Sequence, residues 1–310
     1  MTHTLPHDTD KLFLTDGGLE TTLVFHDRLD LPCFAAFDLL KDDAGTAHLR
    51  EYYQRYLDLA LGHGLGFVLE SATWRASADW GQRLGYTEAA LARANHRAIE
   101  LLHQLHERNR SSETPMVISG NIGPRGDGYV PGQTTSPDEA ADYHLSQIHD
   151  LVENGADTIT ALTLPATGEA IGMVRAAQSV GIPIVISFTV ETDGRLPDGR
   201  TLRSAIESVD AATHNGPAYY MINCAHPTHF DHALAGSETW LARIRGVRAN
   251  ASCKSHAELD ESDTLDDGDP DELGLQYRAL RDRLPNLTVL GGCCGTDHRH
   301  VAAIARTCSP

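Results

Sequence analysis

Short apolar runs alternate along the chain with segments that have the apolar spacing of amphipathic helices. The runs are rich in β-branched side chains and are bounded by Gly, Pro, Asp or Asn, as buried strands are. Such an alternation predicts parallel strands joined by helices, because a chain can return to a parallel strand only by a crossover. The eight runs are residues 11–16, 66–71, 116–121, 157–163, 183–189, 219–224, 247–252 and 287–293.

The helical segments carry recognisable ends. Ser136 is placed to cap a helix that starts with Pro137, and Gly181 is placed to end the following one. We expect helices over residues 46–63, 88–110, 137–154 and 169–180.

Eight strand–helix units fit a closed (β/α)8 barrel, the TIM barrel, better than an open sheet. We therefore expect residues 1–310 to form a single α/β domain of this kind. An open doubly wound sheet is the alternative. It needs a glycine-rich phosphate loop after the first strand, and the DGGLE of residues 16–20 is not G-x-G-x-x-G. In a barrel, the chemistry lies at the C-terminal ends of the strands.

The charge balance excludes some classes of partner. The chain has 43 acidic and 25 basic residues, which gives a formal net charge of −18. Nucleic acid and anionic membranes are therefore not expected as partners. The first residues lack the features of a signal peptide, and no run approaches the ~20 apolar residues that span a bilayer. We expect a cytoplasmic protein, and a homo-oligomer is compatible with the sequence.

Three of the six cysteines stand at predicted strand ends. Cys224 ends the sixth run, and Cys293 and Cys294 lie at the end of the eighth. Those ends share one rim of a barrel, and Gly292 and Gly295 would let both neighbouring sulfurs turn to one point. Three thiolates with one open position match a catalytic zinc site. On spacing alone, an ordinary turn with buried thiols is the alternative, since no C-x-x-C is present.

Four motifs resemble those of the homocysteine S-methyltransferase family. They occur in the family's order: DGGLETTL at 16–23, GNIGP at 120–124, INC at 222–224 and GGCCGT at 291–296. The resemblance implies a (β/α)8 barrel with catalytic Zn2+ on three cysteines, which by position are Cys224, Cys293 and Cys294. It implies no catalytic residue beyond the zinc centre.

The resemblance also implies an activity and two small-molecule partners. The enzyme would move a methyl group from a cationic donor to the zinc-bound thiolate of homocysteine, a reaction of methionine biosynthesis. Family members use betaine, S-methylmethionine, S-adenosylmethionine, or methylfolate through cobalamin in much longer chains. At 310 residues, this chain is similar in size to the S-methylmethionine and S-adenosylmethionine users.

One position departs from the family pattern. After its fourth strand the family has a Glu that binds the amino group of homocysteine, and Leu162 stands there in this chain. Glu191, at the end of the fifth strand, is our candidate to replace it. Alternatively, the same chemistry acts on a different small thiol. The residues expected to contact substrates are Asp16, Gly17, Gly18, Trp74, Thr163, Glu191 and Asn223.

Trp74 matches a family position that is usually aromatic. It could face an onium methyl group through cation–π attraction, or simply pack at the barrel rim. His226, two residues after Cys224, is the best histidine candidate for a contact near the metal, whereas His298 and His300 flank the cap of the last helix.

The acidic residues 258–272 lack the spacing of a calcium loop, so we expect an acidic loop or insert near 255–273. Two other functions are less favoured. A zinc hydrolase would need a carboxylate or His base beside the metal, and a non-catalytic barrel would only bind zinc or a thiol.

Overall fold

In the computed structural model, eight parallel strands close into a barrel in chain order, and β8 pairs with β1. The structure describes residues 4–129, 136–236, 238–262 and 264–309. The closed barrel confirms the predicted (β/α)8 fold and excludes the open sheet. The strands are β1 (Phe13–Leu14), β2 (Gly66–Glu70), β3 (Met116–Ile122), β4 (Thr158–Leu164), β5 (Ile184–Phe188), β6 (Tyr219–Asn223), β7 (Ile244–Ala249) and β8 (Val289–Gly292).

The seventh strand begins earlier than predicted. It was expected at 247–252, but β7 runs from Ile244 to Ala249. Arg245 and Arg248 lie within it, and these charged residues conceal its apolar pattern in the sequence. Asn250 is already outside the strand, where its N–H donates to the carbonyl of Ala225.

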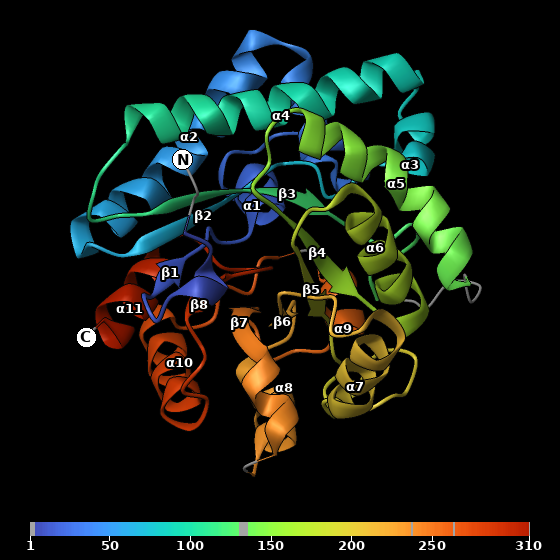
Figure 1. Cartoon of the computed structure of the whole chain (residues 1–310). Coiled ribbons are helices and arrows are strands. Elements are labelled where there is room, and N and C mark those ends of the chain that lie inside the picture. The colour runs from blue at the N-terminus through green and yellow to red at the C-terminus, as the bar shows by residue number, and fades with distance from the viewer. Residues whose placement is uncertain (1–3, 130–135, 237, 263, 310) are drawn as a thin grey trace.

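The helices surround the barrel on its outside (Figure 1). The predicted ends are confirmed: Ser136 and Glu139 form a capping box at the start of α5, and Gly181 ends α6 with φ 72°. The α-helices are α1 (Leu19–Thr21), α2 (Asp43–His63), α3 (Ala78–Arg83), α4 (Glu88–Arg108), α5 (Pro137–Glu153), α6 (Thr167–Val180), α7 (Leu202–Thr213), α8 (Pro227–Phe230), α9 (His256–Asp260), α10 (Pro270–Arg283) and α11 (His298–Cys308). Short 3-10 segments are Pro6–Asp8, Pro32–Phe34, Ala36–Lys41, Asp231–Leu234 and Thr239–Arg243, and a π-helical segment is Thr22–His26.

Apolar side chains fill the inside of the barrel. Phe13, Val68, Val117, Met221 and Val289 belong to one buried cluster, although they come from five different strands. A second and larger cluster packs the outer faces of the strands against the helices. Both faces of each strand are therefore buried, which explains the nearly continuous apolar runs. Because the interior is packed, ligands must bind at a rim.

The acidic segment after β7 is partly helical. Ser255 caps the short helix α9 and forms a capping box with Glu258. Farther along, Asp266 accepts a hydrogen bond from Ser252 at 2.8 Å, and Asp267 pairs with Arg299. Within the described ranges, no helix has both the length and the apolarity of a membrane span.

Replacing a glycine by alanine should destabilise the protein at one helix position and stabilise it at another. A Cβ at Gly172 of α6 would lie 2.4 Å from Ala140 Cβ and 2.6 Å from Pro137 O, both in α5, whereas a Cβ at the exposed Gly62 of α2 would meet nothing within 4 Å. We expect Gly172→Ala to lower the free energy of unfolding by about 1–3 kcal/mol. Gly62→Ala should raise it by about 0.5–1 kcal/mol, through helix propensity. Urea unfolding measures both, and an unchanged Gly172→Ala protein would contradict this packing.

Candidate metal centre and its cavity

The structure brings three cysteine thiols to one point at the C-terminal rim. The thiol sulfurs of Cys224, Cys293 and Cys294 all lie within 4.8 Å of one another, and Cys224 Sγ is 3.3 Å from Cys294 Sγ. Cys224 follows β6 directly, and the other two follow β8. Among the described residues, no other group of three His, Cys, Asp or Glu side chains gathers in this way. The proximity expected from the strand ends is thus present.

Backbone geometry explains how neighbouring residues aim their sulfurs together. Cys224 takes a left-handed conformation with φ 57°, and Gly295 has φ 79°. Gly292 is required for another reason, since a Cβ there would lie 2.0 Å from Thr296 Oγ1. Hydrogen bonds from the other two thiols lower the pKa of Cys293, and the contact with Cys293 raises the pKa of Cys224 in turn. A set of three clustered sulfurs, one of them thiolate-prone, has the donor chemistry that zinc prefers.

Asn223 connects residues of the rim beside the thiols through hydrogen bonds. Its Oδ1 accepts from the Thr163 N–H at 2.9 Å and from Ser187 Oγ at 2.6 Å. Its Nδ2 donates to Thr163 Oγ1 at 2.7 Å and to Cys293 Sγ at 3.8 Å. The fully buried amide therefore uses all its hydrogen-bonding capacity within the protein. Both Asn223 and Thr163 line the cavity described below, but Asn223 acts there by holding Thr163, at φ 62°, and Cys293 in place.

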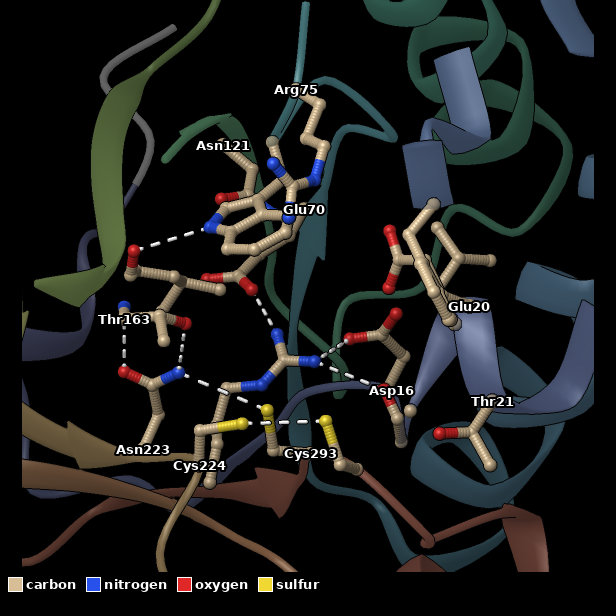
Figure 2. A pocket seen from close by; sticks show the side chains of 18 of the residues that line it. Asp16, Glu20, Thr21, Glu70, Arg75, Asn121, Thr163, Asn223, Cys224 and Cys293 are labelled. Atoms are coloured by element: carbon tan, nitrogen blue, oxygen red, sulfur yellow. Dashed lines mark hydrogen bonds and ion pairs between the residues drawn. The ribbon is translucent and has the colours of Figure 1, made fainter. Parts of the chain in front are cut away.

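A buried arginine between two carboxylates forms another part of the rim (Figure 2). Arg248 Nη2 lies 2.6 Å from Asp16 Oδ1, and Nη1 pairs with Glu70. Nη2 also donates to Gly17 O at 3.1 Å, and Tyr52 Oη donates to Asp16 Oδ2 at 2.9 Å. Burial raises the pKa of Glu70 to about 7. Asp16, predicted to contact substrate, thus lies in the cavity wall with its carboxylate already paired.

The two glycines after Asp16 also lie in the cavity wall. A Cβ at Gly17 would lie 2.8 Å from Tyr56 Oη, and a Cβ at Gly18 would lie 2.6 Å from Cys293 O. Both positions therefore need glycine because other parts of the protein come so close.

A cavity of about 310 Å³ opens above the thiols. Trp74 and Leu162 lie in its wall, and Trp74 Nε1 donates to Leu162 O at 3.2 Å. The Arg75 guanidinium lies 4.6 Å from the centre of the Trp74 ring, so a cation of the protein itself contacts this aromatic. Glu191 is not among the residues that line the cavity. Its carboxylate lies 3.7 Å from His256 Nδ1 instead.

Tyr129, which the sequence did not single out, lies against the thiols. Its hydroxyl is 2.8 Å from Cys224 Sγ and 3.9 Å from Cys294 Sγ, and its ring centre is 4.1 Å from that of His256. Tyr129 lies in the connection after β3, where no periodic pattern marks a functional side chain.

The histidines considered from the sequence, His226 and His300, do not line the cavity. His226 caps α8 and is not in the cavity wall, and burial lowers its pKa to about 4. His300 takes part in the capping box of α11 with Asp297.

Removal of Arg248 tests the buried ion pairs. Arg248→Met leaves two carboxylates without a cation, so we expect a loss of about 3–5 kcal/mol in the free energy of unfolding near pH 8. The loss should shrink as the pH falls to about 5, since both carboxyls then take up protons in the folded variant. Arg203, whose pair with Glu207 is half exposed, is the control. Arg203→Met should change stability by less than about 1 kcal/mol. Equal losses in both variants, or no pH dependence, would contradict the assignment.

Sequence comparison relates the chain to known enzymes. The homocysteine S-methyltransferase family model matches residues 13–308. Homocysteine S-methyltransferase 1 of Arabidopsis thaliana is 23% identical over 315 residues, which cover 94% of this chain and 92% of the relative. The Bacillus subtilis homocysteine S-methyltransferase YbgG is 26% identical over 315 residues, which cover 96% of this chain and 95% of the relative.

Solved structures agree in fold. The homocysteine methyltransferase MmuM of Escherichia coli, in its oxidised form, superposes with a TM-score of 0.76 at 19% identity and covers 98% of both chains. Its metallated form gives 0.72 at 19% identity, with 96% of both chains covered. The match over nearly the whole chain, together with the thiol cluster, identifies the protein as an enzyme: it belongs to the homocysteine S-methyltransferase family.

Proposed function

We propose that this enzyme is a zinc-dependent S-methyltransferase that moves a methyl group from an onium donor to the thiolate of homocysteine. The donor would be of the S-methylmethionine or S-adenosylmethionine type. The observation that carries the proposal is the cluster of three thiols, within 4.8 Å of one another, beneath a cavity of about 310 Å³. That volume suits small metabolites rather than a macromolecule.

Cys224, Cys293 and Cys294 would hold the metal as thiolates. Zinc fits this all-sulfur set, and a metallated form of the related E. coli enzyme is known. Bound there, zinc would lower the pKa of an incoming thiol, so that the acceptor is a thiolate at neutral pH. A hydrolase is less well supported, because among the described residues no His, Asp or Glu joins the three cysteines in the metal-binding group, and an all-thiolate set suits thiol activation better than activation of water.

The protein's own side chains would position the reactants. Asn223 holds Cys293, and the cavity wall confines acceptor and donor together. The acceptor sulfur would bond to the methyl carbon as the carbon–sulfur bond of a sulfonium donor breaks. The electron pair of that bond stays on the donor, which leaves as a neutral thioether.

Leu162 supports a second candidate, the same transfer to a different small thiol. Its side chain is 6% exposed and lies in the cavity wall, where an ammonium group would find no charge.

Cysteine variants test the metal site. Cys224→Ala, Cys293→Ala and Cys294→Ala should each lose zinc, measured by elemental analysis, and lose methyl transfer by more than about a hundredfold, since even indirect damage to metal sites costs 10–100-fold. Cys33→Ala and Cys253→Ala, which change exposed cysteines, should keep both, as should Cys308→Ala in α11. Full zinc content in any of the first three variants would refute the ligand assignment.

The charge of the donor is tested by competition. We expect S-methylmethionine or S-adenosylmethionine to methylate homocysteine orders of magnitude faster than a neutral methyl thioether, because only an onium donor leaves as a neutral product and is attracted to a thiolate-rich site. The consumption of homocysteine is measured at equal donor concentrations, because S-methylmethionine itself leaves as methionine. A faster neutral donor would show that the electrostatic argument is wrong.

A further inference from the structure

Two side chains of opposite charge line the cavity without a salt bridge, and they interact with each other only at longer range. They are Glu20, in α1, and Arg75, which follows β2. In the described part of the chain, neither forms an ion pair within 4.0 Å, although charged residues elsewhere in the same wall are paired. Figure 2 places Arg75 at the top of the cavity and Glu20 at its right, with the sulfur atoms below.

Glu20 is the carboxylate without a cation. It accepts a hydrogen bond from its own backbone N–H but none from a described side chain, and burial raises its pKa to about 7. Asp16 and Glu70, the nearby acids of the wall, are both held by Arg248. Asp127, also in the wall, accepts a hydrogen bond from the Tyr129 N–H. A half-buried carboxylate without a counter-ion is unfavourable by itself, so the site has a place for a positively charged group.

Arg75 is the corresponding cation without a salt bridge: burial lowers its pKa, and the charges of Asp127 and Glu20 only oppose that shift. Its guanidinium lies 3.6 Å from the centre of the Trp80 ring and 4.6 Å from that of Trp74. Its Nε and Nη1 atoms are buried and have no hydrogen-bond partner. The aromatic rings therefore fix the position of the guanidinium and leave its donors unsatisfied. A planar guanidinium held in this way is suited to a carboxylate.

The two groups together match a zwitterion. Leu162 leaves its part of the wall without charge, and Glu191 faces His256 outside the cavity. Among the described residues, Glu20 is a carboxylate of the wall that has neither a salt bridge nor a side-chain hydrogen bond, whereas Arg248 holds Asp16 and Glu70. We propose that Glu20 binds the ammonium group and Arg75 the carboxylate group of an α-amino acid, and that this amino acid is the thiol acceptor. This inference rests on the proposed function, and it makes Glu20 the substitute for the carboxylate that position 162 lacks.

Three thiols that differ by one charged group test the proposal on the zinc-loaded enzyme. They are homocysteine, its des-amino analogue 4-mercaptobutanoate and its des-carboxy analogue 3-mercaptopropylamine. Their dissociation constants are measured by calorimetry without a methyl donor, so the result does not depend on turnover. Zinc content and unfolding are checked for every variant.

Each of two variants should lose affinity for a different charged group of the ligand. Glu20→Gln should weaken homocysteine and 3-mercaptopropylamine at least about tenfold and leave 4-mercaptobutanoate unchanged, since charged hydrogen bonds are the strong ones. Arg75→Gln should weaken homocysteine and 4-mercaptobutanoate by a similar factor and leave 3-mercaptopropylamine unchanged. Glu191→Gln, the matched control outside the cavity wall, should bind all three as the wild type does.

The outcomes separate this inference from the proposed function. If the wild-type enzyme binds thiols, but Glu20→Gln affects all three equally or none, Glu20 does not bind the amine. If Glu191→Gln shows the amine-selective loss instead, that residue takes the role and the inference is wrong. If the wild type binds none of the three thiols, the proposed function itself fails, and the amino-acid site fails with it.

Discussion

The hydrogen bonds that join β6 to β7 and β7 to β8 determine where the three thiols lie. The Cys224 N–H donates to Arg248 O at 3.0 Å, and the Cys293 N–H donates to Ala249 O at 2.8 Å. Both cysteines are thereby tied to consecutive residues of the strand between them. A shift of one residue in either ladder would turn the sulfurs to the wrong face, because side chains alternate along a strand. The metal centre therefore depends on the register of β6, β7 and β8.

The same strand carries the charge that organises the rest of the rim. Arg248 reaches Asp16 after β1 and Glu70 at the end of β2, so one guanidinium connects β7 across the barrel to two other strands. A buried cation between two carboxylates adds little net stability over an apolar replacement, but it is costly to break. Its effect here is spatial: it holds the carboxylates of Asp16 and Glu70 in the cavity wall as ion pairs.

The sequence predicts this architecture well, but only parts of the site. Strand ends converge in any barrel, so the meeting of Cys224 with Cys293 and Cys294 follows from the order of the strands. Tyr129, by contrast, lies in a connection without periodicity, and its contact with Cys224 joins positions far apart in the chain. The ion pairs of Arg248 also depend on side-chain reach across the barrel, which spacing does not reveal. Glu191 lies in the turn after β5, where its N–H donates to Arg195 O. In this position its carboxylate contacts His256 and does not line the cavity.

Leu162 and Glu20 have to be considered together. An apolar residue at a position where the family carries an amine-binding acid suggests, in isolation, an acceptor without an amine. The cavity nevertheless contains a carboxylate and an arginine, the latter held between Trp74 and Trp80, and neither of them forms a salt bridge with a described residue. Burying both charges without a ligand would be unfavourable, and a neutral or singly charged thiol would satisfy at most one of them. A zwitterionic acceptor satisfies both. The two charged side chains therefore favour an amino acid bound in a different orientation over the loss of amino-acid recognition, with the acidic group in α1 and not at the end of β4.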